Sequence, residues 1–250
     1  IEKYCPYLKE YHLSINTKNT FPHSSGIASS ASGMAALAMT IMSLEKKIKP
    51  SISEDYFYSK ASFLARLGSG SACRSIKGEV VIWGENKENP ENSNLYGVPF
   101  STIHDNFKNY QDTILLVDKG EKQVSSTVGH DLMHNHPFAE KRFEQAHDNL
   151  SKIKTILTEG NISEFIKVVE SEALTLHAMM MTSLPYFILM KPNTLAIINR
   201  IWNYRNETEI PVCFTLDAGA NVHVLYPEIH KEKVLNFIKN ELVGYCQNEQ

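Results

Sequence analysis

The chain has 250 residues, 42% hydrophobic and 21% charged, so it can build one large core or two small ones. A formal net charge of -3 leaves no basic excess that would indicate nucleic acid as the main partner. No apolar run approaches the length of a membrane span, and the first residues lack the apolar core of a signal peptide. The four cysteines are scattered and form no paired motif, so we expect reduced thiols and a cytoplasmic protein.

The first part of the chain predicts short strands and two helices. Residues 1–20 are strand-like with polar interruptions, and residues 29–44 predict a mostly apolar helix rich in Ala and Met. Ser51 and Glu54 have capping-box spacing, which predicts the start of a second helix that Gly68 ends. Two further strands are expected at residues 78–84 and 112–118, on either side of a polar loop at residues 85–94.

The rest of the chain predicts helices around two more strands. Helices are expected at residues 137–157, 161 to about 180, 193–204 and 227–242, the last one opening with Pro227. The stretch "PVCFTLDAGANVHVLYP" predicts two strands joined by a tight turn. Strands separated by helices indicate a mixed α/β or α+β fold, and we place a domain boundary near residues 104–111.

Two loops rich in Gly and Ser carry the first functional signal. The first loop, "FPHSSGIASSASG" (residues 21–33), leads into a helix whose free N–H groups and dipole attract an anion. It predicts a phosphate-binding loop, although it is not a Walker A motif, and a close-packed helix explains it equally well. The second loop, "GSGSACRS" (residues 68–75), adds hydroxyls and the planar fork of Arg74, which suits a carboxylate or phosphate. The alternative is a surface loop.

A third stretch, "FTLDAGANVHVLY", places Asp217 at a strand end beside a turn. A carboxylate in that position is well placed to act as a base. The alternative is that Asp217 only stabilises the turn through its side chain.

Together these stretches resemble mevalonate diphosphate decarboxylase, within the superfamily of galactokinase, homoserine kinase, mevalonate kinase and phosphomevalonate kinase. The first loop is similar to the superfamily's Pro-x-x-x-Gly-[LI]-[AG]-Ser-Ser-[AS] phosphate loop, and "GSGSACRS" matches a motif that separates the decarboxylases from the kinases. "VSSTVG" (Val124 to Gly129) and "FTLDAGANVHVLY" resemble the family's "VSST-x-G" and "TFDAGPNA" segments. The resemblance implies the superfamily's two-domain α+β fold, with an ATP- and phosphate-binding domain at residues 1–107, a second domain at residues 108–250, and an active site in the cleft between them.

The resemblance implies an ATP-dependent reaction on mevalonate 5-diphosphate. The C3 hydroxyl is phosphorylated, and loss of that phosphate together with CO₂ gives isopentenyl diphosphate. Asp217 is expected to accept or orient the hydroxyl proton, and Arg74 to hold the substrate carboxylate. Mg²⁺ is expected to arrive with ATP and not in a protein cage. The other expected binding residues are Ser69, Ser71, Ser126 and Thr127 for the substrate and Gly26, Ala28, Ser29 and Ser30 for the ATP phosphates.

Some features qualify the resemblance. Residues 1–20 do not match the family's opening Asn- and Lys-containing motif, so we expect a C-terminal part of a longer protein. The missing opening motif leaves a non-catalytic remnant that binds nucleotide or a partner as one alternative. His130 stands where many members carry Met, which leaves a related kinase or decarboxylase of another phosphorylated mevalonate as the other. "HAMMMTSLPYF" is similar to a site-lining family segment and gives His177 and Ser183 a minor candidacy, and the resemblance also allows a homodimer.

Overall fold

The computed structural model describes residues 1–21, 26–85, 90–120 and 131–247. Its internal contacts divide the chain into two compact units. The first unit comprises Ile1–His23 and Ala28–Ser101, and the second comprises Ser24–Ile27 and Thr102–Gln250. No helix among the described residues is both long and apolar enough to cross a membrane.

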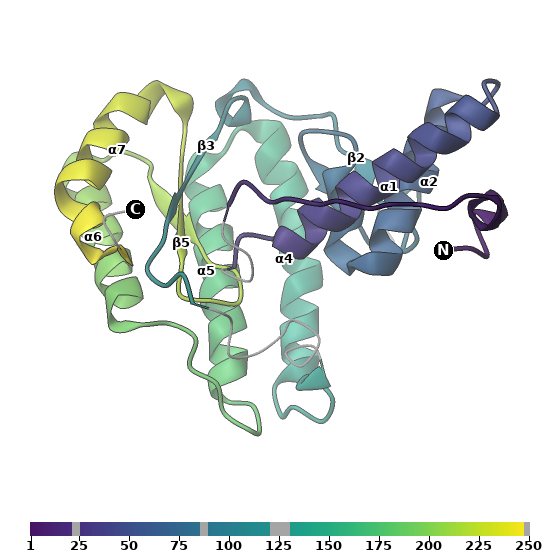
Figure 1. Cartoon of the computed structure of the whole chain (residues 1–250). Helices are drawn as coiled ribbons and strands as arrows, with labels where there is room; N and C mark the ends of the chain where they lie inside the picture. Colours follow the sequence, from purple (N-terminus) through teal and green to yellow (C-terminus); the bar gives the residue numbers. More distant parts are fainter. Residues whose placement is uncertain (22–25, 86–89, 121–130, 248–250) are drawn as a thin grey trace. The chain divides into compact units, whose positions relative to one another are not determined.

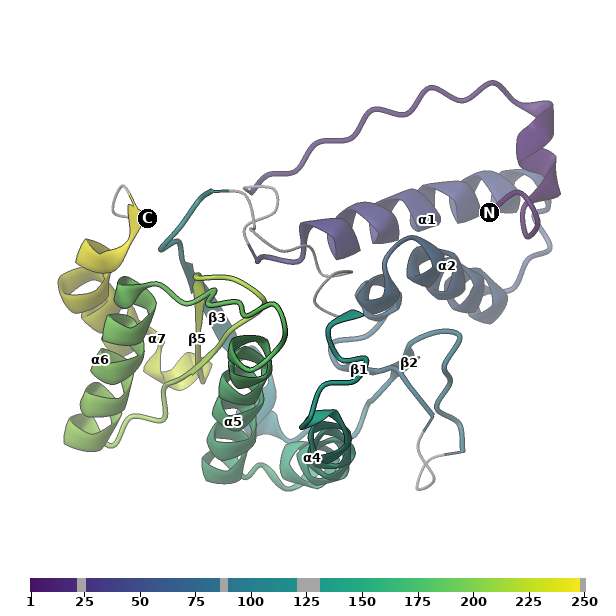
Figure 2. The ribbon, with the colours of Figure 1, turned by 90° about the horizontal axis from the view of Figure 1, so that it is seen from below.

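The first unit is built on two helices that lie side by side (Figures 1 and 2). They are α1 (Ser29–Ile48) and α2 (Glu54–Gly68), accompanied by the 3-10 turns η1 (Pro6–Glu10) and η2 (Gly70–Ser75) and by the short antiparallel pair β1 (Val81–Ile82) and β2 (Val98–Pro99). Buried alanines at Ala31, Ala35 and Ala38 recur on one face of α1, which lets α2 approach closely. The close-packed reading of this helix is therefore correct for its alanines.

Two local predictions in this unit are wrong. Residues 1–20 form η1 and then an extended segment that is paired with no strand in the described part of the chain. Alternation alone does not make a strand, because its backbone groups need a partner. The N-cap of α2 is Ser53, whose Oγ accepts from the Tyr56 N–H at 3.3 Å, and not Ser51. Gly68 ends α2 as expected, and a Cβ there would collide with the Met34 side chain.

The second unit has a three-stranded antiparallel sheet of order β3-β5-β4. Its strands are β3 (Gln111–Leu115), β4 (Cys213–Thr215) and β5 (Val222–Tyr226). The helices α4 (Ala139–Glu159), α5 (Ile162–Met181), α6 (Pro192–Thr208) and α7 (Lys231–Phe237) lie around it (Figures 1 and 2), with the short turns η3 (Asp105–Phe107), η4 (Glu228–His230), η5 (Ile238–Leu242) and η6 (Val243–Tyr245). Helices thus pack on an antiparallel sheet in this unit.

The core of this unit lies between one face of the sheet and α5, α6 and α7. On β5, Val222, Val224 and Tyr226 are buried in it, as the alternation along the strand predicts. Ile197, Ile198 and Ile201 of α6 fill it from the helix side. The single helix expected at residues 227–242 is divided into η4, α7 and the π-helical turn η5. The mixed composition of helices and antiparallel strands confirms the α+β class.

Candidate active site

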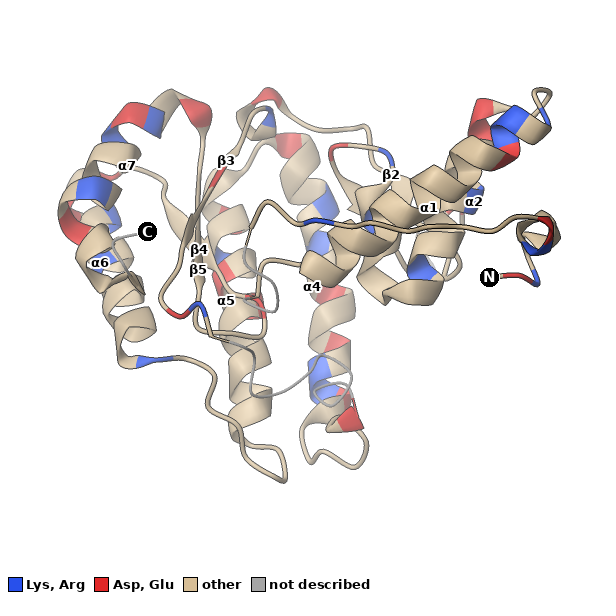
Figure 3. Ribbon diagram, viewed as in Figure 1, with Lys and Arg blue, Asp and Glu red and all other residues tan. Residues whose placement is uncertain are grey.

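The first loop reaches the start of α1 through two residues with left-handed backbone, the buried Gly26 and the exposed Ala28. Gly26 has φ +79° and Ala28 has φ +54°, both in the left-handed region, and α1 begins at Ser29. Ala28 offers no side-chain oxygen to cap the first N–H groups of the helix. Figure 3 shows that the first turns of α1 carry no charged side chains. The charged residues of this helix lie near its C-terminal end. An anion approaching the start of α1 therefore meets a positive helix dipole and no competing carboxylate from α1.

The second loop meets the first at a pair of serines. Ser69 is the residue before η2, and its Oγ lies 3.4 Å from Oγ of the exposed Ser30 on α1. Arg74, on the same 3-10 turn, is exposed, and Ser71 is half-buried. Two hydroxyls and a guanidinium thus belong to neighbouring segments of one unit, an arrangement suited to a ligand with several anionic groups.

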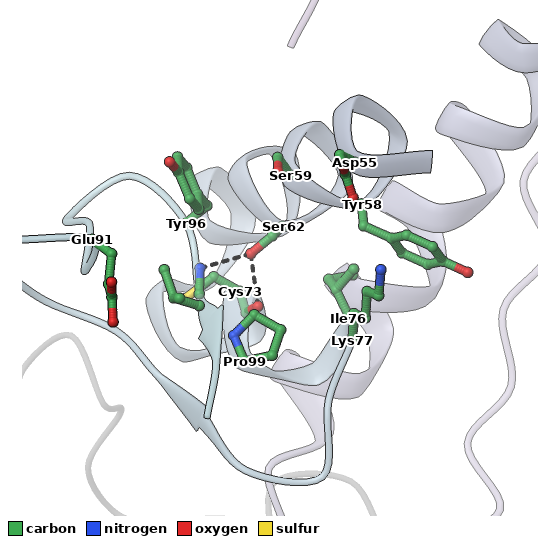
Figure 4. A pocket seen from close by; sticks show the side chains of 12 residues that line it. Asp55, Tyr58, Ser59, Ser62, Cys73, Ile76, Lys77, Glu91, Tyr96 and Pro99 are labelled. Atoms are coloured by element: carbon green, nitrogen blue, oxygen red, sulfur yellow. Dashed lines mark hydrogen bonds between the residues drawn. The ribbon is translucent and has the colours of Figure 1, made fainter. Parts of the chain in front are cut away.

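A buried serine holds the second loop in place from behind. Ser62 of α2 is 3% exposed, and its hydroxyl donates to the Cys73 carbonyl at 2.7 Å and accepts from the Gly97 N–H at 2.9 Å. Figure 4 shows these two bonds beside a cavity of about 310 Å³ between α2 and the β1–β2 hairpin. A Cβ on Gly97 would lie 2.8 Å from the Cys73 carbonyl oxygen, so this close approach requires glycine.

Cys73 is a packing residue in the second loop. It is 1% exposed, and its Sγ lies 3.1 Å from the Gly70 carbonyl oxygen. Burial raises the pKa of the Cys73 thiol, and the nearby Arg74 and Arg66 only partly oppose that shift. The thiol therefore stays protonated and is not the nucleophile of this site. All four cysteines of the chain are free thiols.

Asp217 opens the turn between β4 and β5 with an exposed carboxylate. Its Oδ1 accepts the Ala218 N–H at 2.7 Å, so the turn-stabilising role proposed as the alternative is present. Its backbone carbonyl accepts from Nε2 of His177, at 3.1 Å, on α5. Because a carbonyl only accepts, the ring nitrogen of His177 must carry the proton. The turn contact engages one carboxylate oxygen of Asp217, and the side chain is exposed, so the turn role leaves the role of a base open as a proposal.

His177 is buried and neutral. It is 1% exposed, and burial lowers its pKa, which the hydrogen bond to Asp217 opposes only in part. His177 therefore supports the turn and does not line the site, because its ring contacts the backbone of Asp217 and has no exposed surface for a ligand. Ser183 is also 1% exposed, and its Oγ lies 2.8 Å from the Met180 carbonyl and 2.7 Å from the Pro185 carbonyl. Its hydroxyl is used inside its own turn.

The far end of the Asp217 turn is fixed by two residues that sequence reasoning missed. Asn221 forms a reciprocal pair with the backbone of Asp118, at 2.9 and 3.0 Å, at the end of β3. Thr194, at the start of α6, donates to the Ala220 carbonyl at 2.6 Å. Both side chains are buried. Only Thr194 has a signal in the sequence, because it follows Pro192 in the first turn of a predicted helix.

Not every expected site residue can be placed together. Ser126, Thr127 and His130 lie outside the described residues. Arg74, Ser69 and Ser30 belong to the first unit and Asp217 to the second, and each unit is described by itself. Among the residues that the structure describes, no three His, Cys, Asp or Glu side chains gather to hold a metal ion.

Comparison with known proteins identifies the family of both parts of the chain. Residues 1–95 match the diphosphomevalonate decarboxylase-like N-terminal domain, and residues 113–250 match the mevalonate 5-diphosphate decarboxylase C-terminal domain. Diphosphomevalonate decarboxylase of Candida albicans is 28% identical over 235 residues, which cover 93% of this chain and 62% of that protein. The chain spans about three-fifths of the length of the curated relatives it matches.

Solved structures agree in fold. A mevalonate diphosphate decarboxylase from Legionella pneumophila superposes with a TM-score of 0.76 at 30% identity, covering 92% of this chain and 68% of that one. A structure described as MDDEF in complex with MVAPP, AMPPCP and magnesium gives a TM-score of 0.73 at 28% identity, covering 90% and 66% of the two chains. On the match of both domains and the shared fold, the chain belongs to the mevalonate 5-diphosphate decarboxylase family.

Proposed function

We propose that this protein catalyses the ATP-dependent decarboxylation of mevalonate 5-diphosphate to isopentenyl diphosphate. The observation that carries the proposal is the contact of the two anion-binding loops at Ser30 and Ser69. Relatives named diphosphomevalonate decarboxylase and a related structure holding MVAPP and AMPPCP support it. A loop suited to nucleotide phosphates next to a loop suited to a second anionic substrate is what a phosphoryl transfer between the two requires.

The chemistry assigns each residue one task. A tertiary hydroxyl is a poor leaving group, so it is first phosphorylated, and Asp217 accepts or orients its proton. The phosphate then leaves from C3 as the C–C bond to the carboxylate breaks, and that electron pair forms the new double bond while CO₂ departs. Arg74 would hold the carboxylate in the plane that aligns the breaking bond, and its exposed guanidinium supports this role.

The described part of the first loop fits the phosphates of ATP. The uncapped start of α1, the left-handed residues Gly26 and Ala28 and the exposed hydroxyl of Ser30 offer donors without a negative charge. Gly26, Ala28, Ser29 and Ser30 are therefore proposed to bind the nucleotide. When bound, Mg²⁺ would offset the negative charge of the phosphates. The proposed loop residues offer hydroxyls and N–H groups and no carboxylates, so Mg²⁺ is proposed to arrive bound to ATP.

The remaining assignments are proposals of the same kind. Ser69 and Ser71 are proposed to bind the anionic groups of the substrate from the second loop, and Ser126 and Thr127 from the "VSSTVG" segment. Of these residues, Ala28, Ser29, Ser30, Ser69, Ser71 and Arg74 belong to the first unit, and Gly26, Ser126, Thr127 and Asp217 belong to the second. We further propose a cytoplasmic location and a homodimer.

The test is the stoichiometry of the reaction. The product of the complete reading frame is incubated with ATP, Mg²⁺ and mevalonate 5-diphosphate, and ADP and CO₂ are measured together, with substrate omitted as the control. Equal amounts of ADP and CO₂ are expected. ADP without CO₂ would replace the proposal by a kinase activity, and product only from mevalonate 5-phosphate would replace the substrate. If neither ADP nor CO₂ is formed from either substrate, the result would favour a non-catalytic protein.

A further inference from the structure

The strand that leads to Asp217 is short and lies at the edge of its sheet. It is β4 (Cys213–Thr215), which pairs with β5 alone among the strands that the structure describes. Asp217 follows β4 closely, so the position of its carboxylate depends on the position of this strand. Because a short edge strand has few backbone bonds to oppose a slip along its neighbour, contacts from outside the sheet are needed to fix β4.

The first such contact is a buried ion pair between α5 and α6. Glu170 of α5 is 8% exposed. Arg205 of α6 donates to it from both terminal nitrogens, from Nη1 to Oε1 at 2.6 Å and from Nη2 to Oε2 at 3.1 Å. The indole N–H of Trp202 also donates to Oε2, at 2.9 Å. The Glu170 carboxylate therefore has a cation in bidentate geometry and a third donor, as a buried charge requires.

The same guanidinium also binds the backbone at the start of β4. Nη1 of Arg205 donates to the carbonyl oxygen of Val212 at 2.8 Å. Val212 is the residue before β4, and it is fully buried in the core of the second unit. Since α5 packs beside β4 (Figure 3), a side chain that holds Glu170 and Val212 together fixes the start of the strand relative to the helix.

The second contact lies at the other end of the strand. About two helical turns after Glu170, His177 of α5 donates to the carbonyl oxygen of Asp217 at 3.1 Å. The helix α5 therefore holds β4 on both sides, at Val212 before the strand and at Asp217 after it. Two attachments to one helix oppose both sliding and rotation of the strand, whereas one attachment leaves it able to pivot.

We propose that Glu170 and Arg205 are positioning residues, which set the placement of β4 against α5 and through it the placement of the Asp217 carboxylate. They act through the backbone of Val212 and β4. A catalytic group must be held within about 0.5 Å of its productive position, and a displacement of about 1 Å costs on the order of 100-fold in rate. The catalytic part of this proposal rests on the proposed function, in which Asp217 handles the proton of the hydroxyl.

The first experiment compares two arginines that pair with the same helix. In Arg205→Lys the charge stays, but the planar fork that serves Glu170 and Val212 together is lost. The control is Arg142→Lys, because Arg142 of α4 donates from both terminal nitrogens to Glu172, also on α5. Thermal denaturation records the stability of both variants, and we expect both melting temperatures to fall.

Steady-state kinetics then separates positioning from stability. In Arg205→Lys we expect kcat to fall about ten- to 100-fold, with KM for mevalonate 5-diphosphate within about twofold of wild type. In Arg142→Lys we expect both constants to stay within about twofold. Equal losses of kcat in the two variants, or a rise in KM alone in Arg205→Lys, would overturn the proposal.

A double variant removes the charges without leaving one of them unpaired. Replacing a buried ion pair by apolar side chains of similar volume often preserves stability, so Glu170→Leu combined with Arg205→Met should regain most of the melting temperature lost in Arg205→Lys. Its kcat should stay low, because the Val212 carbonyl still lacks its donor. Recovery of kcat together with stability would show that the pair only stabilises the fold. If the double variant is unstable, the comparison of Arg205→Lys with Arg142→Lys decides.

The last experiment needs no turnover. Hydrogen exchange of the backbone amides of residues 213–218 is followed by mass spectrometry in the complete protein. We expect exchange about tenfold faster in Arg205→Lys than in wild type, the size of one lost charged hydrogen bond, and unchanged in Arg142→Lys. If wild type releases neither ADP nor CO₂, the proposed function fails, and this exchange alone decides whether the pair positions the turn. If wild type is active and the exchange ignores Arg205, the function stands and the positioning role falls.

Discussion

The imidazole of His177 donates a hydrogen bond of 3.1 Å to the backbone carbonyl of Asp217, across 40 residues of sequence. The donor lies in the core of the second unit and the acceptor opens an exposed turn. The carboxylate of Asp217 therefore takes its position from a buried, neutral ring on α5.

Replacing His177 tests this support. His177→Leu should lower kcat by about tenfold while leaving KM for mevalonate 5-diphosphate nearly unchanged, because the turn loses one buried hydrogen bond but keeps its charges. His177→Gln, which retains a donor, should recover part of the loss. Steady-state kinetics of both variants measures the split. A rise in KM with kcat unchanged would place His177 in substrate binding instead.

The same histidine gives a dependence of stability on pH. Its pKa in the folded protein is lowered from 6.5, so the unfolded chain binds the proton more readily. The contribution of His177 to stability is therefore complete above that value and is lost as the pH falls toward the folded pKa. Denaturant midpoints measured from neutral to acidic pH should fall less steeply in His177→Gln than in wild type. Parallel curves would contradict the shift.

Asp217→Asn tests the catalytic carboxylate. The amide keeps an oxygen for the Ala218 N–H but cannot take a proton, so turnover should fall at least about 100-fold, the usual contribution of a general base. Binding of an ATP analogue should remain within about twofold, since the variant changes none of the residues proposed to bind the nucleotide. Asp148→Asn, an exposed carboxylate on α4, serves as the control. Near-normal turnover in Asp217→Asn would remove the assignment.

Chemistry-bearing segments could be predicted from the sequence because they are local. The start of α1 at Ser29, the end of α2 at Gly68 and the β4–β5 turn depend on neighbouring residues, and each was expected within a few positions. The strand expected in residues 1–20 failed because pairing depends on a partner elsewhere in the fold.

Long-range support could not be predicted. Ser62 beneath the second loop, and Thr194 and Asn221 at the Asp217 turn, act on residues that lie 11 to 103 positions away in the sequence. In the case of Ser62, the shorter of its two links spans only 11 residues, yet it joins a helix to a separate turn. The sequence around a buried serine or threonine does not indicate which backbone carbonyl its hydroxyl will bond.

Arg74→Lys tests the geometry of the second loop. Lysine keeps the charge but loses the planar fork, so we expect kcat/KM to fall about 100-fold, the loss of roughly two charged hydrogen bonds. Exposure of Arg74 makes a folding defect a poor explanation for such a loss. Arg66→Lys on α2 is the matched control, since its Nε donates to the Leu95 carbonyl and Arg66 is not among the proposed binding residues. Unchanged kinetics in Arg74→Lys would exclude a bidentate role.

Ser62→Ala tests the support of the second loop. Removal of the hydroxyl leaves the Cys73 carbonyl and the Gly97 N–H without their shared partner, which should cost about 1–3 kcal/mol of unfolding free energy. Ser59→Ala, one turn earlier on α2 and exposed, should change it by less than about 0.5 kcal/mol. Denaturant titration distinguishes the two. Equal effects would mean that the bonds of Ser62 do not stabilise the loop.

The buried pair Glu45–Lys60 between α1 and α2 gives the last prediction. Lys60 Nζ lies 2.7 and 2.8 Å from the Glu45 carboxylate oxygens, and the side chains are 14% and 5% exposed. Lys60→Met leaves a buried carboxylate without its cation and should cost about 3–5 kcal/mol of unfolding free energy, whereas Glu45→Leu combined with Lys60→Met should recover most of it. Lys141→Met, from the exposed pair with Glu144, should cost less than about 1 kcal/mol. A double variant as unstable as the single one would show that α1 and α2 need the charges themselves, and not only the space that they fill.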